Sequence, residues 1–398
     1  GTIISMGKEY IAAAQEEGVA TAVKHFPGDG VDERDQHLLT SVNSLSCEEW
    51  DATYGTIYSE MIEAGTLSIM AGHIALPAYE EYFEKKEVRQ VVPATLSKNL
   101  LQNLLREKLG FNGLIVTDAT PMVGFCSAME RRLAVPMAIE NGCDVFLFNR
   151  NMEEDFVFMR EGIENGILSQ ERLEKAIKRI LATKAAMKLP EKKERHELVP
   201  RNEALPILRC KEHDVWATEC ANEGVTLVKD TQQLLPLSAN KTKRVLLELM
   251  GDFASNERVL NHFVTKLEKE GFEVTVYQPE GFEVMEDSVT SFSERYDLIF
   301  YIANVETASN KTVSRLNWHT MFGLGNNMPW MVNEIPALFV SVGNPYHLLD
   351  APMVKTYING YCNSDYVIEA VMEKLMGRDK FIGVSPIDPF CGRKELAY

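Results

Sequence analysis

Long apolar runs, paired cysteines and an excess of positive charge are all missing from this sequence. No run approaches the about 20 apolar residues that span a bilayer. The seven cysteines are scattered without a Cys-x-x-Cys pair, so neither a zinc site nor a disulfide framework is predicted. With 41 Lys and Arg against 58 Asp and Glu, the net charge is −17, which argues against nucleic acid or an anionic membrane as the main partner.

Motifs for cofactors and for secretion are absent as well. The sequence contains no G-x-x-x-x-G-K-[ST] phosphate loop and no credible G-x-G-x-x-G motif, so no nucleotide cofactor is predicted. Its histidines lack the H-x-x-x-H or H-x-H spacing that favours a metal site, and we predict no metal. An odd, dispersed set of thiols without a signal peptide is typical of a cytoplasmic protein, which is the location we expect.

The first half of the chain alternates strand and helix patterns. Apolar runs predict strands at 19–24, 67–71, 114–118 and 144–148. Helical patterns separate or follow them at 5–17, 46–64, 97–108, 128–141, 153–166 and 169–187, and Ser46 with Glu49 forms a predicted capping box at the start of one. Alternation of this kind predicts an α/β fold with parallel strands and helical crossovers.

A proline-rich and charged stretch at 188–212 divides the chain. After it, strands are predicted at 224–228, 243–249, 273–277, 297–302 and 337–342, with helices at 256–270 and 364–376. A length of 398 residues also exceeds one ordinary core. We therefore expect a catalytic domain at 1–189, a linker at 190–215 and a second α/β domain at 216–398.

Polar side chains interrupt the predicted strands of the first half at their carboxyl ends. Lys24 and His25 end the first strand, His73 follows the second, and Asp118 ends the third. Catalytic groups of parallel α/β folds gather at this edge, so these residues are candidates for one site. A salt bridge at the rim would also account for Lys24, and a hydrogen-bonded core histidine for His73.

The chemistry that we expect depends on the Asp35/His37 pair and on Asp118. Asp35 and His37 are spaced i, i+2 and point to one side of an extended loop. A carboxylate on one imidazole nitrogen fixes the tautomer of the ring and makes a proton-transfer pair, although residues 32–35 also read as a solvated charge run. Asp118 is a candidate nucleophile or metal ligand, and the alternative is an N-cap for the next helix.

The motif K-H-F-P-G-x-G at 24–30, followed by D-x-H at 35–37, resembles the signature of glycoside hydrolase family 3. More narrowly, it is similar to the branch of β-N-acetylglucosaminidases, or β-N-acetylhexosaminidases, which use a His/Asp acid-base pair. Asp29 stands where that branch has His, and Gln36 stands where it has Ser. We expect the exchange at Gln36 to matter little because its side chain should point away from the pair.

Further segments resemble the same family in the same order. They are 70–73, 93–97, the strand 109–119 with Met122, and 141–144, together with 234–237 and 340–346 in the second half. The resemblance implies the C-terminal part of a TIM-like (β/α)8 barrel followed by an α/β sandwich domain. It also implies site roles: Asp118 is the nucleophile, His37 with Asp35 is the acid-base pair, and the sugar is held by Lys24, His25, His73 and Met122.

The implied activity is retaining removal of terminal β-linked N-acetylglucosamine from small carbohydrates such as peptidoglycan or chitin fragments. A histidine in place of a second carboxylate puts less negative charge at the acceptor position, so phosphorolysis is an alternative to hydrolysis. A β-glucosidase-like relative is a further enzyme reading. An inactive sugar-binding module is the alternative outside the enzymes.

The predicted barrel portion is short. A barrel of this type takes typically ~250 residues, whereas the expected strands occupy only 19–148. The upstream segment that in this family holds the non-reducing sugar has no counterpart here. We therefore expect the C-terminal part of a longer enzyme, whose open strand edges are covered by a second copy of the chain, a swapped arrangement or an altered fold.

Overall fold

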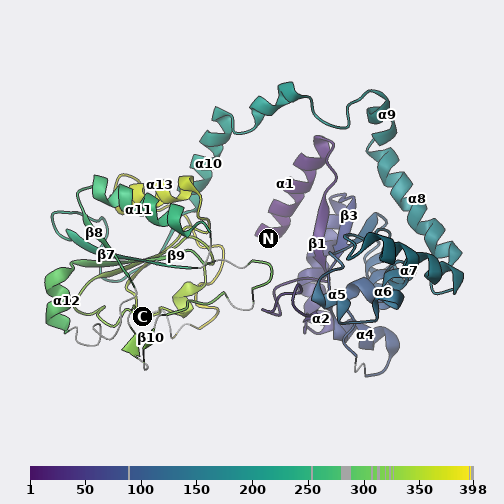
Figure 1. Cartoon of the computed structure of the whole chain (residues 1–398), viewed down its shortest axis with the longest axis horizontal. Helices are drawn as coiled ribbons and strands as arrows, with labels where there is room; N and C mark the ends of the chain where they lie inside the picture. Colours follow the sequence, from purple (N-terminus) through teal and green to yellow (C-terminus); the bar gives the residue numbers. More distant parts are fainter. Residues whose placement is uncertain are drawn as a thin grey trace. The chain divides into compact units, whose positions relative to one another are not determined.

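The computed structural model describes residues 1–87, 90–251, 254–278, 288–305, 308–311, 314–318, 320–321, 324–325, 327–393 and 395. The chain forms two compact units, which are described separately. The first comprises Gly1–Pro200 with Ser309–Thr312, and the second comprises Arg201–Ala308 with Val313–Tyr398. Figure 1 shows the elements of both units.

A parallel sheet forms the centre of the first unit. Its strands are β1 (Ala22–Phe26), β3 (Ser68–Ala71) and β5 (Leu114–Thr117), hydrogen-bonded in the order β1-β3-β5. A smaller parallel pair joins β2 (Ser41–Val42) to β4 (Ile74–Ala75). The three main strands confirm the predictions for 19–24, 67–71 and 114–118, and their parallel pairing brings all three carboxyl ends to one edge.

Helices connect and surround these strands, as the alternating pattern predicts. The α-helices are α1 (Thr2–Glu16), α2 (Cys47–Trp50), α3 (Thr56–Glu63), α4 (Pro77–Glu84), α5 (Val123–Cys126), α6 (Arg131–Asn141), α7 (Met152–Glu164), α8 (Gln170–Ala186) and α9 (Leu189–Glu194). The helix at Asn99–Lys108 and the link Asp51–Gly55 between α2 and α3 are π-helical. The capping box of Ser46 and Glu49 is present.

The predicted strand at 144–148 is wrong. Only one isolated bridge, between Val116 and Val145, pairs this run with β5. The amides of Asp144 and Val145 both donate to the carbonyl of Ile115, at 2.7 and 3.2 Å, which breaks the even spacing of a parallel ladder. The amide of Leu147 donates to the Thr117 hydroxyl, 2.9 Å away, where a strand would use a backbone carbonyl.

Asp144 itself explains part of this departure. Its side chain is completely buried and accepts hydrogen bonds from Arg106 at 2.7 Å and Arg172 at 2.9 Å. The Asp144 carboxylate also accepts a bond from the amide of Ile115, at 3.0 Å. A buried carboxylate with this many donors fixes the local backbone, so the chain here follows the ion cluster instead of continuing as a regular strand.

A six-stranded sheet organises the second unit. Its order is β6-β13-β12-β9-β7-β8, and β6 alone runs antiparallel to its neighbour. The strands are β6 (Thr226–Asp230), β7 (Arg244–Met250), β8 (Glu273–Val276), β9 (Leu298–Ala303), β12 (Ala337–Ser341) and β13 (Thr356–Asn359). The short pair β10 (Thr320–Met321) and β11 (Leu324–Gly325) lies outside this sheet. Strand β13 escaped prediction because it is short and its neighbours in the sequence carry little pattern.

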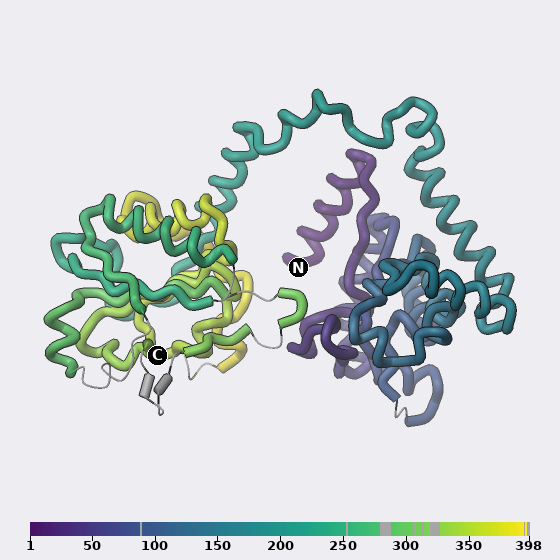
Figure 2. Tube along the Cα trace, viewed as in Figure 1, coloured from purple at the N-terminus to yellow at the C-terminus, as the bar shows by residue number. Residues whose placement is uncertain are grey.

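Helices cover both faces of this sheet. The helices α11 (Asn256–Lys269) and α13 (Asp365–Leu375) pack together on one face, and α10 (Lys211–Gly224) packs against α13. The helix α12 (Val289–Arg295) contributes Phe292 to the apolar cluster on the opposite face. Figure 2 shows how the trace passes from α8 through residues 187–210 into α10. Helix α10 begins inside the range predicted as linker, because no proline interrupts 211–224.

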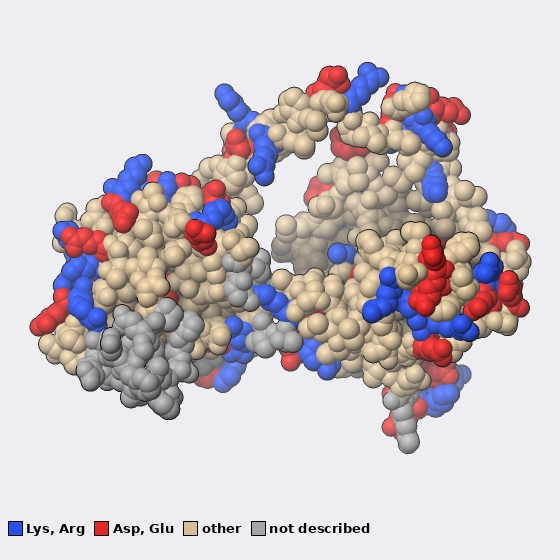
Figure 3. All heavy atoms as spheres, viewed as in Figure 1, with Lys and Arg blue, Asp and Glu red and all other residues tan. Residues whose placement is uncertain are grey.

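Charged side chains of both signs are visible on each unit in the space-filling view (Figure 3). Figure 3 shows Lys and Arg side chains interspersed with Asp and Glu side chains on the visible face. Neither sign of charge forms a single patch on that face (Figure 3). In the described part of the chain, no helix combines the length and the apolar character required to cross a membrane.

A carboxylate is buried in the central sheet of the second unit. Glu248 of β7 is 4% exposed and lies on the sheet face of Leu246 and Met250, near Tyr301. Burial raises the pKa of Glu248 to about 8, and the hydrogen bond from the Asn327 amide offsets only part of that effect. The native state therefore binds a proton that the unfolded chain releases near its ordinary pKa of 4.5. Stability conferred by the neutral side chain falls as the pH rises from about 4.5 to 8.

We expect Glu248→Gln to leave the stability nearly unchanged at pH 4.5 and to raise it at pH 9, on the order of 1–3 kcal/mol. The amide keeps an acceptor for Asn327 and carries no charge to desolvate. Thermal unfolding at both pH values measures the difference. Glu268→Gln, which removes an exposed carboxylate from α11, is the matched control. An equal gain for both variants, or a larger gain at pH 4.5, contradicts the assignment.

Candidate active site

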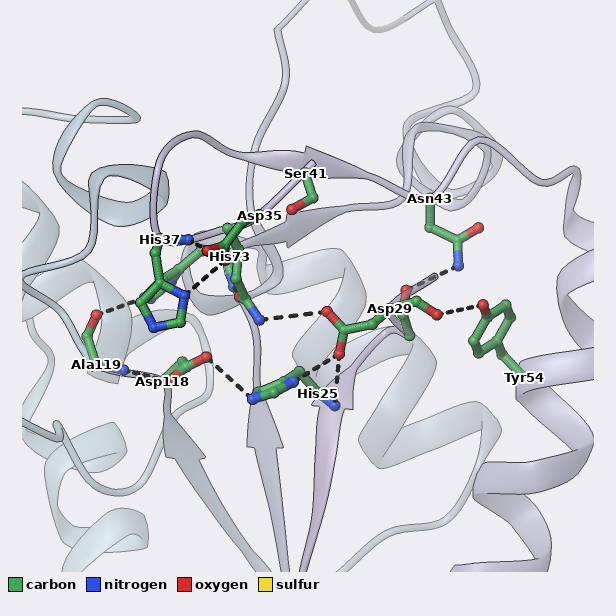
Figure 4. A network of polar contacts seen from close by, with 12 residues as sticks. His25, Asp29, Asp35, His37, Ser41, Asn43, Tyr54, His73, Asp118 and Ala119 are labelled. Atoms are coloured by element: carbon green, nitrogen blue, oxygen red, sulfur yellow. Dashed lines mark hydrogen bonds and ion pairs between the residues drawn. The ribbon is translucent and has the colours of Figure 1, made fainter. Parts of the chain in front are cut away.

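Asp118 and His25 meet at the carboxyl edge of the parallel sheet. Asp118 follows β5 directly, its amide donates to the Ala71 carbonyl at 2.9 Å, and its Oδ1 accepts from the Ala119 amide at 2.7 Å. His25 lies near the end of β1, and its Nε2 is 3.5 Å from Asp118 Oδ2. The side chains are 13% and 21% exposed, so the second carboxylate oxygen of Asp118 is confined but reachable. Figure 4 shows this arrangement.

Asp35 and His37 form the hydrogen-bonded pair that their spacing predicts. Asp35 Oδ1 is 2.7 Å from His37 Nδ1 and accepts from the His37 amide at 2.9 Å. A carboxylate at Nδ1 holds the proton on that nitrogen and directs Nε2 to proton transfer. The alternative of a freely solvated loop is not what the structure shows, because the Asp35 side chain is 19% exposed.

A third donor completes the environment of Asp35. Its Oδ2 accepts from the backbone amide of Asn310, 2.6 Å away, in a segment that groups with the first unit. Burial alone would raise the pKa of Asp35, but the bonds from the His37 amide and ring and from the Asn310 amide outweigh burial and lower it. Asp35 is therefore a carboxylate whose charged form the fold favours.

The loop that carries this pair is pinned against the segment after β5. The amide of Val123 donates to the His37 carbonyl at 3.0 Å, and the amide of Gly124 donates to the Gln36 carbonyl at 3.2 Å. A Cβ at Gly124 would lie 2.6 Å from the Gln36 carbonyl oxygen, so only glycine allows this approach. The segment that follows Asp118 and the loop of Asp35 and His37 are thus held together by backbone hydrogen bonds.

The side chain of Gln36 makes its hydrogen bonds to groups outside the Asp35/His37 pair. Its side chain is buried, and its Oε1 accepts from the His73 amide at 2.7 Å. The backbone turns at residues 35–39, where the amide of Leu38 donates to the Asp35 carbonyl. This turn replaces the extended chain that the spacing suggested, and it carries the Gln36 side chain to His73 and Asp29.

His73 is completely buried. Its Nδ1 is 3.0 Å from the Thr95 hydroxyl and its Nε2 is 2.9 Å from the Ala119 carbonyl. Burial lowers the pKa of His73, and the neutral ring satisfies both contacts by donating from Nε2 and accepting at Nδ1. This matches the alternative of a hydrogen-bonded core histidine. Its contact with Ala119 steadies the residue next to Asp118, while a direct role toward sugar stays a prediction.

The two remaining candidates differ in exposure. Lys24 is exposed on β1, and Met122 is 6% exposed at the start of α5. Their roles in holding a sugar stay predictions. Among the residues with a described position, no cluster of three or more His, Cys, Asp or Glu side chains is arranged to hold a metal ion.

Three residues of the site lacked an assigned role in the sequence reading. Asp29 Oδ2 is 2.7 Å from His25 Nδ1, and the spacing of four residues is a signal that could have suggested this contact. Thr95 lies in the segment 93–97, for which the sequence indicates only a family resemblance. Asn310 follows Asp35 by 275 residues and contributes a backbone amide, so no sequence pattern identifies it.

Known proteins resemble this chain along nearly its whole length. Residues 2–183 match the family described as the glycosyl hydrolase family 3 N terminal domain. A β-N-acetylglucosaminidase/β-glucosidase of Cellulomonas fimi is 43% identical over 400 residues, covering 98% of this chain and 70% of that protein. A solved structure of the β-glucoside phosphorylase BglX is 43% identical with a TM-score of 0.91, covering 98% of this chain and 69% of that one. A β-hexosaminidase of Tolumonas auensis is 32% identical over 163 residues, covering 41% of this chain and 46% of that protein.

These likenesses, with a parallel α/β unit presenting acid-base groups at its strand ends, identify an enzyme of the glycosidase class. The chain belongs to glycoside hydrolase family 3. This confirms the resemblance drawn from the motifs at 24–30 and 35–37. It also confirms the fold class, a TIM-like α/β part followed by an α/β sandwich.

We expect Asp35→Asn to lower kcat/KM for an aryl N-acetyl-β-glucosaminide about 10²–10⁴-fold, the usual contribution of a positioned proton-transfer group. The asparagine side chain lacks the negative charge that stabilises an imidazolium at His37. Its NH₂ group would also place a donor against the backbone N–H of Asn310, which is itself a donor. Steady-state kinetics near pH 7 measures the loss. Glu33→Gln, an exposed neighbour, serves as control.

Stability provides a second readout for the same variant. Because the folded pKa of Asp35 is lowered, its carboxylate stabilises the fold above the unfolded pKa of about 3.9, and this contribution is lost as the pH falls through the folded pKa. The parent protein should therefore exceed Asp35→Asn in melting temperature at pH 7, and the difference should shrink toward pH 3. A difference that is constant with pH contradicts the role of the charge.

Proposed function

We propose that this chain cleaves terminal β-linked N-acetylglucosaminides, and related β-glucosides, in two displacements with retention at the anomeric carbon. The observation that carries the proposal is the joining of Asp118 at the end of β5 to the loop that holds the Asp35/His37 pair. The names of the Cellulomonas fimi relative and of the Tolumonas auensis β-hexosaminidase support the substrate class. Small soluble saccharides such as peptidoglycan or chitin fragments are the proposed substrates.

In the first displacement, Asp118 attacks the anomeric carbon and the bond to the leaving oxygen breaks. His37 donates its Nε2 proton to that oxygen, and Asp35 stabilises the pair in its hydrogen-bonded orientation. In the second displacement, the neutral His37 takes a proton from the acceptor, which attacks the glycosyl ester and releases Asp118. Lys24 and His25 supply donors to the sugar hydroxyls.

The acceptor is a second question, and a specific observation favours phosphate as an alternative to water. The solved relative with a TM-score of 0.91 is a β-glucoside phosphorylase. A neutral imidazole at the acceptor position repels a phosphate anion less than a carboxylate would. Phosphorolysis uses the same two displacements, with a phosphate oxygen in place of water, and yields a sugar 1-phosphate.

We expect Asp118→Ala to lose at least about 10³-fold in kcat/KM, because removing a nucleophile abolishes the first displacement. Added azide should then replace the missing carboxylate and give the α-glycosyl azide. In His37→Ala the glycosyl ester still forms from an activated substrate, so azide should give the β-glycosyl azide. NMR of the products distinguishes the two anomers. Activity that survives Asp118→Ala without azide contradicts the nucleophile.

We expect the parent protein to form sugar 1-phosphate at millimolar phosphate if the acceptor position favours that anion. His37→Glu should shift the product toward free sugar, because a carboxylate at that position repels the phosphate dianion by about 1 kcal/mol or more. Separation of the products from a chromogenic N-acetyl-β-glucosaminide, with and without phosphate, measures the ratio. Free sugar alone at every phosphate concentration assigns the enzyme to hydrolysis.

A further inference from the structure

Two residues that have no role in the proposed chemistry contact each other beside the site. The Gln36 side-chain amide Nε2 donates to Asp29 Oδ1 over a long 3.5 Å. Gln36 is 5% exposed, whereas the Asp29 side chain is 49% exposed. Both positions depart from the motif that this sequence otherwise resembles, and the departures meet in the fold.

Asp29 serves His25 with its other oxygen. Asp29 Oδ2 is 2.7 Å from His25 Nδ1, so the opposite ring nitrogen faces Asp118 Oδ2 at 3.5 Å. A half-exposed carboxylate exerts a screened charge, so its effect is mainly to fix the rotation of the imidazole. The Tyr54 hydroxyl donates to the Asp29 carbonyl at 2.5 Å, which holds this part of the loop in place.

Gln36 anchors the acid-base loop from within. It lies between Asp35 and His37 in the sequence, and its Oε1 accepts from the His73 amide at 2.7 Å. Its carbonyl accepts from the Gly124 amide. The side-chain amide thus bridges two partners of opposite polarity, a backbone donor on one side and a carboxylate acceptor on the other. Serine at this position is too short to bridge the same two partners.

We propose that Gln36 and Asp29 act as a pair of positioning residues that joins the acid-base loop to His25 and, through His25, to the nucleophile Asp118. The chain of contacts runs from the residue between the two members of the dyad to the carboxylate that forms the glycosyl ester. Neither residue transfers a proton. Gln36 fixes the loop that carries the proton donor His37, and Asp29 fixes the orientation of His25, which binds the sugar. The inference rests on the proposed roles of His37 and Asp118.

Leaving-group dependence tests the link to the acid. A 2,4-dinitrophenyl N-acetyl-β-glucosaminide departs without protonation, whereas the phenyl analogue needs the proton from His37. We expect Gln36→Ser to lose about tenfold in kcat/KM on the phenyl substrate and less than about twofold on the dinitrophenyl substrate. Glu33→Gln should change neither value. An equal loss on both substrates overturns the proposal, because it indicates general damage to the fold.

A reversal of hydrogen-bond polarity tests the contact with Asp29. Gln36→Glu places two carboxylates against each other and should lose more than Gln36→Ser on the phenyl substrate. Asp29→Asn supplies a donor to the new carboxylate and still offers an oxygen to His25. Combining the two substitutions should therefore recover at least about fivefold relative to Gln36→Glu alone, since residues in contact are coupled. Strictly additive losses overturn the pair.

The His37→Ala variant separates this inference from the proposed function. If that variant loses equally on both leaving groups, His37 is not the acid, and the proposed function fails together with the inference. If His37→Ala shows the expected dependence and Gln36→Ser does not, the positioning pair alone is overturned. Melting temperatures of all variants at pH 7 show whether each is folded, and the double variant provides a readout that unfolding does not mimic.

Discussion

The parallel pairing of β1, β3 and β5 is the constraint on which the site depends. Parallel strands place their carboxyl ends at one edge of the sheet. His25 and Asp118, which are far apart in the sequence, become neighbours there because of the strand pairing alone. The hydrogen bond from the Asp118 amide to the Ala71 carbonyl extends that ladder by one residue beyond the strands. The carboxylate is consequently positioned by backbone geometry and not by a flexible loop.

Around this rigid carboxylate the site is built from donors and acceptors of complementary polarity. Each oxygen of Asp35 has a protein donor, and His25 lies between two carboxylates. Both ring nitrogens of His73 are engaged, Nδ1 with the Thr95 hydroxyl and Nε2 with the Ala119 carbonyl. The polar groups named here are therefore paired with one another or with the backbone.

Much of this arrangement follows from local sequence patterns, and the failures have physical causes. The spacing of Asp35 and His37 and the capping box at Ser46 are short-range features, and both are present in the fold. The run at 144–148 reads as a strand because its apolar residues match the pattern, but the buried Asp144 draws its backbone into an ion cluster. The contacts of Gln36 with His73 and Asp29 depend on a turn at 35–39 that the sequence does not reveal.

The amide of Asn310 has a consequence for how the site comes into being. It bonds Asp35 across 275 residues of sequence, so a growing chain that already displays Asp35, His37 and Asp118 still lacks one donor to the dyad. At 5–20 residues per second, the ribosome reaches position 310 roughly 14–55 s after position 35. During that interval Asp35 lacks the donor that bonds its Oδ2 in the complete fold. The hydrogen bonds around Asp35 are thus completed late in synthesis, when the segment with Asn310 emerges.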